Sequence, residues 1–315
     1  MAMERTSLRL ERDENVSKTV ETIGEECLRL YEALLSATMV NHDDTDQTRL
    51  ATRLCLVYFL EKIQSVTRAA LTLILAGQGI EAMSLIREQY QFIIALYYYQ
   101  NNRGEALLFM VSQSFTKLKF AREVMNFDAK AAIDPHRIEQ LLELEEAVAD
   151  AYKRYPGMRK AKGKSGTSRS PVWIDWSEPS AFDMQYEVMN RLFRAEHAKR
   201  GEIIDEIAFK ERLEKIAKRT YFMRSTFISQ SKHGTAFGLG GSFDFNEHGE
   251  IERREHQVGE PDGLAFHFIS TALPPLVVYR DDMVPGTLEA EIIALDESCS
   301  VLGKKIGIID EPFEI

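Results

Sequence analysis

The chain has 315 residues, of which 44% are hydrophobic and 28% are charged, and its formal net charge is −10 at pH 7. These values are typical of an ordinary globular protein that is long enough to bury a substantial core. The net negative charge argues against a protein that binds nucleic acid through its overall field, because such binding depends on neutralising phosphates.

Cysteine spacing and hydropathy lead to an expectation about where the protein is located. The three cysteines, Cys27, Cys55 and Cys299, lie far apart and have no disulfide or metal-ligand spacing, which indicates a reducing compartment. Residues 1–15 are charged throughout and do not resemble a signal peptide. The most apolar stretch, 71–99, contains glycines and charged residues and is too polar to span a bilayer. We therefore expect a soluble cytoplasmic protein with no membrane partner.

The first predicted helix, 14–40, carries a seam of apolar residues that are separated alternately by four and three positions. Such an a/d seam is typical of a helix that packs in a bundle or in a dimer. We therefore expect this helix either to pack within the chain or to bind a protein partner or a second copy. The seam consists of Val16, Val20, Ile23, Cys27, Leu30 and Leu34.

Apolar periodicity continues along most of the remaining chain and predicts further helices. Asp44 to Asp46 offers a cap for the second helix, and Asp134-Pro135 is a start signal for the fifth. Gly77 and Gly79 interrupt or end the second helix. Besides the helix that starts at Pro135, the expected ranges are about 46–77, 80–100, 103–127, 180–197, 202–232, 262–281 and 286–302.

Two segments break the helical pattern. Residues 153–170 contain seven basic residues and no acidic one, interleaved with Gly and Ser, which predicts a basic loop. Glycines open the segment 234–261, in which we expect a small β-hairpin with Gly249 at its turn. The sequence therefore predicts an all-α fold, a bundle of about eight to nine helices with a basic loop and a hairpin insertion. The helices on both sides of the basic loop are too apolar to be stable alone, which favours a single domain over 1–315.

Three short segments resemble motifs for phosphate, dinucleotide and metal binding, but each lacks a feature that the motif requires. Upstream of Gly163-Lys164-Ser165, the nearest glycine, Gly157, leaves five intervening residues where a phosphate-binding loop has four. The glycines at 238–241 lack the strand-turn-helix setting of a dinucleotide site. His248 and His256 lie among acidic residues of the expected hairpin, without the rigid frame of a metal site. We expect no cofactor and no metal.

Aromatic residues flank the basic loop 153–170, which is typical of proteins that bind single-stranded nucleic acid. RNA is therefore one candidate partner for this loop, an acidic partner is a second, and a solvated loop without a partner is the third alternative. The aromatic residues are Tyr152, Tyr155, Trp173 and Trp176.

Two pairs of polar residues lie on otherwise apolar helices. Arg87 and Gln91 are one turn apart on the most apolar helix, and Ser229 and His233 are one turn apart near the end of another. Because an unpaired buried charge is costly, the two pairs are expected to meet. His233 also lies at a helix C-terminus, where the helix dipole favours its protonated form.

This polar cluster has two interpretations. In the first, it is a structural hydrogen-bond network that determines helix register. In the second, it is a catalytic site in which His233 is an acid or base, Arg87 holds an anion and Ser229 assists. The binding residues would then be Gln91 and two neighbours that lie one turn apart on the second helix, Gln64 and Arg68.

The order of these features resembles a bacterial all-helical family known as a domain of unknown function, family five-six-seven-seven. The family pattern has Arg-x-x-x-Glu on a central apolar helix, then a tryptophan-containing linker, then Ser-x-x-x-His. The similar region covers about 50–240, with Arg87–Gln91, Trp173 or Trp176, and Ser229–His233 as counterparts. Here Gln91 replaces the family glutamate, so that a carboxylate able to act as a base or ligand becomes a neutral amide.

The Ser-x-x-x-His helix is also similar to the HEPN ribonucleases, helical proteins with an Arg-x(4–6)-His motif that are common in toxin and anti-phage systems. This similarity implies a metal-independent ribonuclease in which His233 exchanges a proton with a 2′-hydroxyl and Arg87 stabilises the phosphate. However, eight residues separate Arg224 from His233, which is too many for the motif. We therefore favour a binding or regulatory component over an enzyme, and the resemblances imply a role in bacterial defence or stress response.

Overall fold

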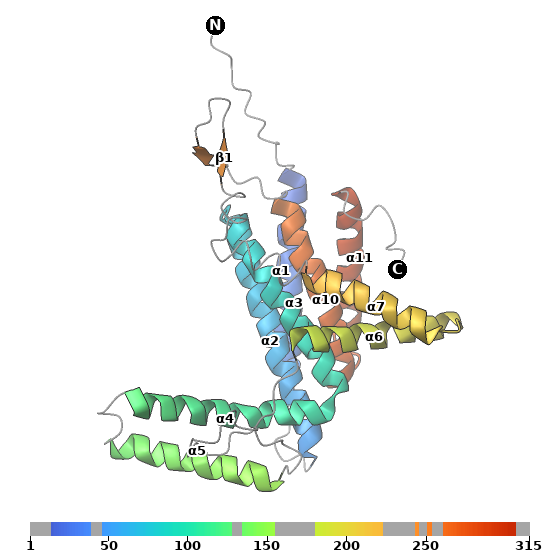
Figure 1. Cartoon of the computed structure of the whole chain (residues 1–315). Helices are drawn as coiled ribbons and strands as arrows, with labels where there is room; N and C mark the ends of the chain where they lie inside the picture. Colours follow the sequence, from blue (N-terminus) through green and yellow to red (C-terminus); the bar gives the residue numbers. More distant parts are fainter. Residues whose placement is uncertain are drawn as a thin grey trace. The chain divides into compact units, whose positions relative to one another are not determined.

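The computed structural model describes most of the chain as helix, and within the described residues there are nine α-helices and two short strands (Figure 1). The all-α fold expected from the sequence is confirmed. The described residues are 14–38, 46–127, 134–154, 180–222, 243–245, 251–253 and 261–306. The helices are α1 (Glu14–Ala37), α2 (Gln47–Leu75), α3 (Gly79–Asn101), α4 (Arg103–Phe127), α5 (Pro135–Arg154), α6 (Ala181–Arg200), α7 (Glu206–Tyr221), α10 (Pro261–Met283) and α11 (Glu289–Lys305).

The helix boundaries follow local capping chemistry. Asp46 Oδ1 accepts hydrogen bonds from the backbone N–H groups of Thr48 and Arg49 at 3.0 and 3.1 Å, so it caps α2. Asp134 Oδ1 caps α5 by accepting from the N–H of His136 at 3.0 Å. Gly77 ends α2 in the left-handed region, with φ of 77°, where a side chain would be strained. These starts and stops confirm the cap and turn signals in the sequence.

The chain divides into two compact units. Unit 1 takes the described residues within 1–39, 56–98 and 181–315, and unit 2 takes those within 40–55 and 99–180. The single domain expected over 1–315 stays a prediction. Among the described helices, none has both the length and the apolar composition needed to cross a bilayer.

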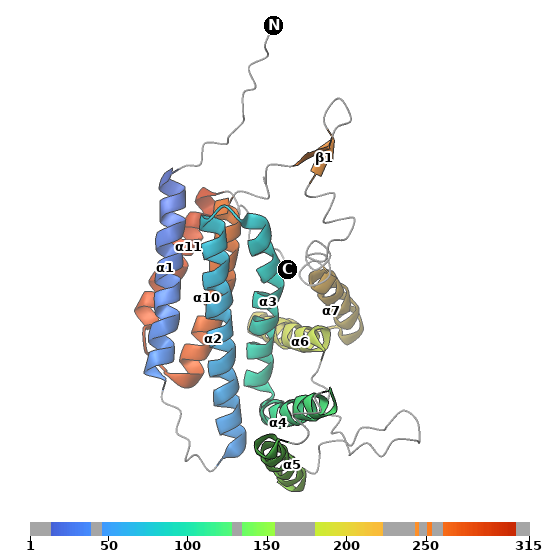
Figure 2. The ribbon, with the colours of Figure 1, turned by 90° about the vertical axis from the view of Figure 1, so that its left-hand side faces the viewer.

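In unit 1, α1, α3, α10, α11 and the unit 1 part of α2 run side by side (Figure 2). All six residues of the predicted a/d seam of α1 are buried, and the seam is used to pack this helix within the chain. The expectation that the first helix packs in a bundle is therefore confirmed. Because the seam is covered, a second copy would have to use another face of α1.

A buried glutamine joins three helices of this bundle. Gln89 on α3 is 1% exposed, and its amide nitrogen donates to Thr67 Oγ1 of α2 and to the carbonyl oxygen of Phe268 in α10, both at 2.9 Å. Its carbonyl oxygen accepts from the hydroxyl of Thr271 at 2.7 Å. Both amide protons and the amide oxygen are thus bonded, as a buried polar group requires.

The helix α10 contains Pro274 and Pro275, which lack the N–H groups that would bond to carbonyls one turn earlier. At the same level, the buried hydroxyl of Tyr31 on α1 donates to the carbonyl oxygen of Ala272 at 2.6 Å. About two turns further along, Thr38, which directly follows α1, and Tyr279 of α10 have their hydroxyls 2.6 Å apart. These bonds attach α1 to α10 around the proline pair.

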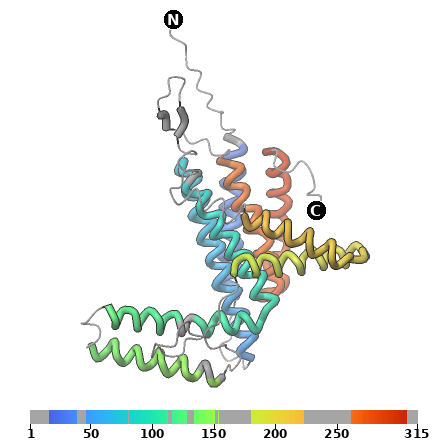
Figure 3. The backbone as a smooth tube through the Cα atoms, in the orientation of Figure 1, coloured from blue at the N-terminus to red at the C-terminus, as the bar shows by residue number. Residues whose placement is uncertain are grey.

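In unit 2, α4 and α5 lie side by side (Figure 3). Leu118 and Val148 are buried between them, and Arg122 donates to Glu145 at 2.6 Å. In the described part of the predicted basic loop, Lys153 and Arg154 form the end of α5, and residues 155–170 lie outside the described residues.

Two smaller pairs of elements complete the described part of unit 1. Helices α6 and α7 pack against each other, and Arg194 of α6 binds both carboxylate oxygens of Glu206 at the start of α7, at 2.8 and 2.7 Å. Within the segment 234–261, strands β1 (Phe243–Phe245) and β2 (Ile251–Arg253) pair antiparallel, with Phe245 opposite Ile251.

The glutamine network predicts the effect of one substitution. Gln89→Met keeps the length of the side chain but removes three hydrogen bonds, so we expect the free energy of unfolding to fall by about 1–3 kcal/mol in urea denaturation. Gln78→Met, at an exposed position between α2 and α3, is the matched control and should change it by less than about 0.5 kcal/mol. Equal stability of the two variants would show that the network does not stabilise the bundle.

Candidate functional site

The structure describes two of the four residues of the polar cluster that was predicted from the sequence. Arg87 and Gln91 lie one turn apart on α3, as expected, and both are half-buried. Ser229 and His233 lie outside the described residues, so their meeting with Arg87 and Gln91 stays a prediction. The same holds for the catalytic interpretation of the cluster.

The other two candidate binding residues, Gln64 and Arg68, lie on α2 and bond to α1. Gln64 Nε2 donates to the carbonyl oxygen of Leu28 at 3.4 Å. The Arg68 guanidinium forms an ion pair with Glu32, and both side chains are about half exposed. The structure thus places these two residues at the junction of the first two helices.

A cavity of about 120 Å³ opens beside Arg68 between α1, α2 and α10, and we call it the α1–α2 cleft. All three helices contribute to its apolar floor, and α1 and α2 contribute its polar rim. The floor includes Val20, Leu28, Leu71, Ile74 and Ala265. The rim includes Ser17, Glu21, Glu25, Arg68 and Thr72.

The position of the cleft follows from a close approach of helices at Gly24. A Cβ atom at this position would lie 3.0 Å from Leu71 Cδ1 of α2 and 3.4 Å from Ile269 Cδ1 of α10. The absence of a side chain at Gly24 therefore lets α1 touch both neighbours. Gly24 itself lines the cleft, which opens where the helices separate from this contact.

The charge at the rim of the cleft is negative. Glu21 and Glu25 are one turn apart on α1, and both are exposed. Arg68 is the one cation among the described lining residues, and its ion pair with Glu32 compensates its charge. A ligand in the cleft would therefore meet an apolar floor below two carboxylates that repel each other.

Three functional candidates of the cleft, Gly24, Glu21 and Glu25, are absent from the prediction based on the sequence. The sequence does contain a signal for them. Gly24 lies inside the first predicted helix, close to the large seam residues Val20 and Ile23. A glycine in a helix interior is unfavourable and often marks close packing. Glu21 and Glu25, on either side of Gly24, flank that point of close packing.

The described residues contain no group of three or more His, Cys, Asp or Glu side chains that could hold a metal ion. All three cysteines are free and buried, as expected for thiols that do not react. Burial raises the pKa of Cys55 and of Cys299 to about 12. Burial, and then the neighbouring Cys299, raise the pKa of Cys27 as well. A thiol acts as a nucleophile only as the thiolate, so these groups are poor nucleophiles at neutral pH.

The thiol pKa values predict slow chemical modification. A thiol with a pKa of about 12 is ionised in only about one molecule in ten thousand at pH 8. We expect Ellman's reagent to react with the native protein far more slowly than with free cysteine, and with all three thiols in guanidinium chloride. Rapid reaction of the native protein would mean that at least one thiol is accessible and ionised.

Comparisons with family models, with curated proteins and with solved structures give no match for this chain. The resemblance to the bacterial family of unknown function and the looser similarity to HEPN proteins therefore stay predictions. The functional argument rests on the residues of the chain itself.

Proposed function

We propose that this protein is a binding or regulatory component, and that it takes a small ligand in the α1–α2 cleft. The observation that carries the proposal is a cavity with an apolar floor and with the exposed Glu21 and Glu25 on its rim, beside Arg68, a candidate binding residue from the sequence. Apolar pockets with a few polar groups at the rim are the usual form of a ligand site. A role in bacterial defence or stress response follows from the resemblance alone.

The size of the cleft limits the apolar part of the ligand. Its volume of about 120 Å³ is close to that of engineered protein cavities of about 150 Å³ that bind benzene. The floor therefore accommodates one aromatic ring or a short branched alkyl group. A larger ligand would extend past the rim, over Glu21 and Glu25.

The charges at the rim select the polar part of the ligand. Glu21 and Glu25 repel an anion and attract a cation, and Arg68 is already paired with Glu32. We therefore assign the cleft to an amine whose apolar body enters the floor. Such binding would attach α1 more firmly to α2 and α10, which is one way for a ligand to regulate a helical component.

Benzylamine, a protonated amine with one ring, is the probe for this proposal. We expect it to raise the melting temperature and to shift NMR signals of cleft residues, whereas benzoate should do neither. A ligand at ten times its dissociation constant raises the free energy of unfolding by about 1.4 kcal/mol. Replacing both Glu21 and Glu25 with Gln should weaken benzylamine binding roughly two- to thirtyfold, since each exposed ion pair contributes about 0.2–1 kcal/mol.

The matched control replaces Glu139 and Glu143 with Gln, because these residues are also exposed and one turn apart, on α5. This variant should bind benzylamine as the unchanged chain does. If both double variants lose the same affinity, or if benzoate binds as well as benzylamine, the charge argument for the cleft is wrong.

The ribonuclease alternative makes a different prediction. Under our proposal, purified protein leaves RNA intact. If the protein cleaves RNA, and if His233→Ala abolishes this cleavage without changing the melting temperature, the binding proposal is wrong and the protein is a ribonuclease. A fall in melting temperature alone would indicate that His233 has a structural role.

A further inference from the structure

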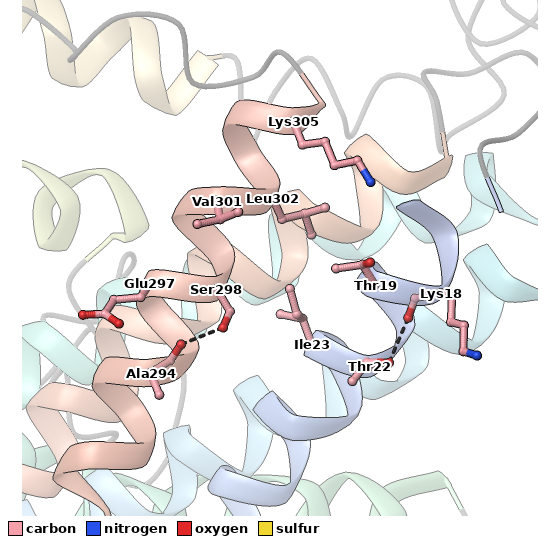
Figure 4. A pocket seen from close by; sticks show the side chains of 10 residues that line it. All are labelled: Lys18, Thr19, Thr22, Ile23, Ala294, Glu297, Ser298, Val301, Leu302 and Lys305. Atoms are coloured by element: carbon pink, nitrogen blue, oxygen red, sulfur yellow. Dashed lines mark hydrogen bonds between the residues drawn. The ribbon is translucent and has the colours of Figure 1, made fainter. Parts of the chain in front are cut away.

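A second concave surface lies between α1 and α11, and we call it the α1–α11 groove (Figure 4). It has a volume of about 810 Å³ and is open to solvent along its length. The buried side chains of Ile23 and Leu302 form its floor. Lys18 of α1 and Lys305 of α11 lie at one end, and Figure 4 shows Lys305 extending toward α1.

Charged residues lie on α1 and α11 beyond the opposite end of the groove. Arg29 on α1 binds Glu26 at 2.6 Å. That hydrogen bond and the charge of Glu26 raise the pKa of Arg29, and the charge of Glu291 on α11 raises it further, which places this acid near α1. The groove therefore lies toward the other ends of α1 and α11, beside Lys18 and Lys305.

The outer face of α11 carries an exposed stripe with a spacing of four residues. Ile293 is 50% exposed and Val301 is 69% exposed. Glu297 lies between them, and Lys305 follows one turn after Val301. Residues four apart form a ridge on a helix surface. This ridge therefore exposes apolar residues that alternate with an acid and a base.

The ridge is complementary to itself. Val301 is the midpoint between Glu297 and Lys305. If two α11 helices cross antiparallel at Val301, each Glu297 lies opposite the Lys305 of the other copy. Ridges with a spacing of four interdigitate at crossing angles of about −50°, the commonest helix packing in globular proteins. A twofold axis is also the commonest symmetry of oligomers, and it requires such a self-complementary surface.

The polar groups in the groove allow it to be covered. Thr22 donates to the carbonyl oxygen of Lys18 at 2.9 Å, and Ser298 donates to that of Ala294 at 2.8 Å, as the dashed lines in Figure 4 show. Both hydroxyl protons are bonded within their own helices, so covering them leaves no unpaired donor. Lys18 then adds a second cation for the incoming Glu297.

We propose that a second copy of this chain occupies the α1–α11 groove, and that the two copies form a symmetric dimer about Val301. The ion pairs between Glu297 and Lys305 determine the direction of the crossing. The apolar residues of the ridge lose their exposure to water in the interface, and this burial stabilises the dimer. This inference is independent of the ligand proposed for the α1–α2 cleft.

The test measures the mass of the full chain by analytical ultracentrifugation over a range of concentrations. We expect two copies of the 36.0 kDa chain per particle at high concentration. Val301→Glu places two further carboxylates at the axis and should give a monomer. The matched control, Ile207→Glu on α7, changes a residue that is 75% exposed and should leave the dimer intact. Circular dichroism checks that both variants are folded.

Charge reversal separates this dimer from other contacts. Glu297→Lys alone and Lys305→Glu alone place like charges together, and each should weaken the dimer at least about tenfold, because two symmetric pairs are lost. The double variant restores opposite charges and should recover the dimer. A chain that is monomeric at every concentration, a dimer that survives Val301→Glu, or a double variant that stays monomeric would each overturn the proposal.

Discussion

The bundle of unit 1 depends on how three apolar helices satisfy one buried amide. Gln89 is buried, and its cost of burial is offset only if α2 and α10 present Thr67, Thr271 and the carbonyl of Phe268 at the correct level. A shift of one helix by a residue would leave donors and acceptors unpaired. The glutamine therefore selects one register among many that apolar packing alone would allow, and α1 is then attached to α10 through Tyr31.

The two concave surfaces both result from the path of α1 along this bundle. At Gly24 this helix touches Leu71 and Ile269, and the α1–α2 cleft opens beside that contact. On its other side, the groove toward α11 opens beyond the charges around Arg29. The cleft is small and partly enclosed, which suits a small ligand, whereas the groove is open and suits another helix. In the two proposals, one helix would thus serve two different kinds of binding.

Much of the fold was predictable because its signals are local. The a/d seam of α1, the aspartates that cap α2 and α5, and the glycine that ends α2 act through their own helix or turn, and each is where the sequence indicates. The site was less predictable. The spacing of Arg87 and Gln91 is local and is found as expected, but their half-burial and the pairing of Arg68 with Glu32 depend on which helices become neighbours.

The sequence by itself determined the all-α class, the capped starts of α2 and α5 and the buried face of α1, because periodicity and capping involve only nearby residues. The expected helices 202–232 and 286–302 began too early, since α7 begins at Glu206 and α11 at Glu289. Tertiary structure decided which polar residues join helices to one another. Gln89 lies three residues after Ile86 and four before Ile93, on the core face of α3, yet only contacts with α2 and α10 make it a junction. The cleft at Gly24 and the groove beside Val301 likewise exist only where helices distant in sequence meet, and no local pattern encodes that meeting.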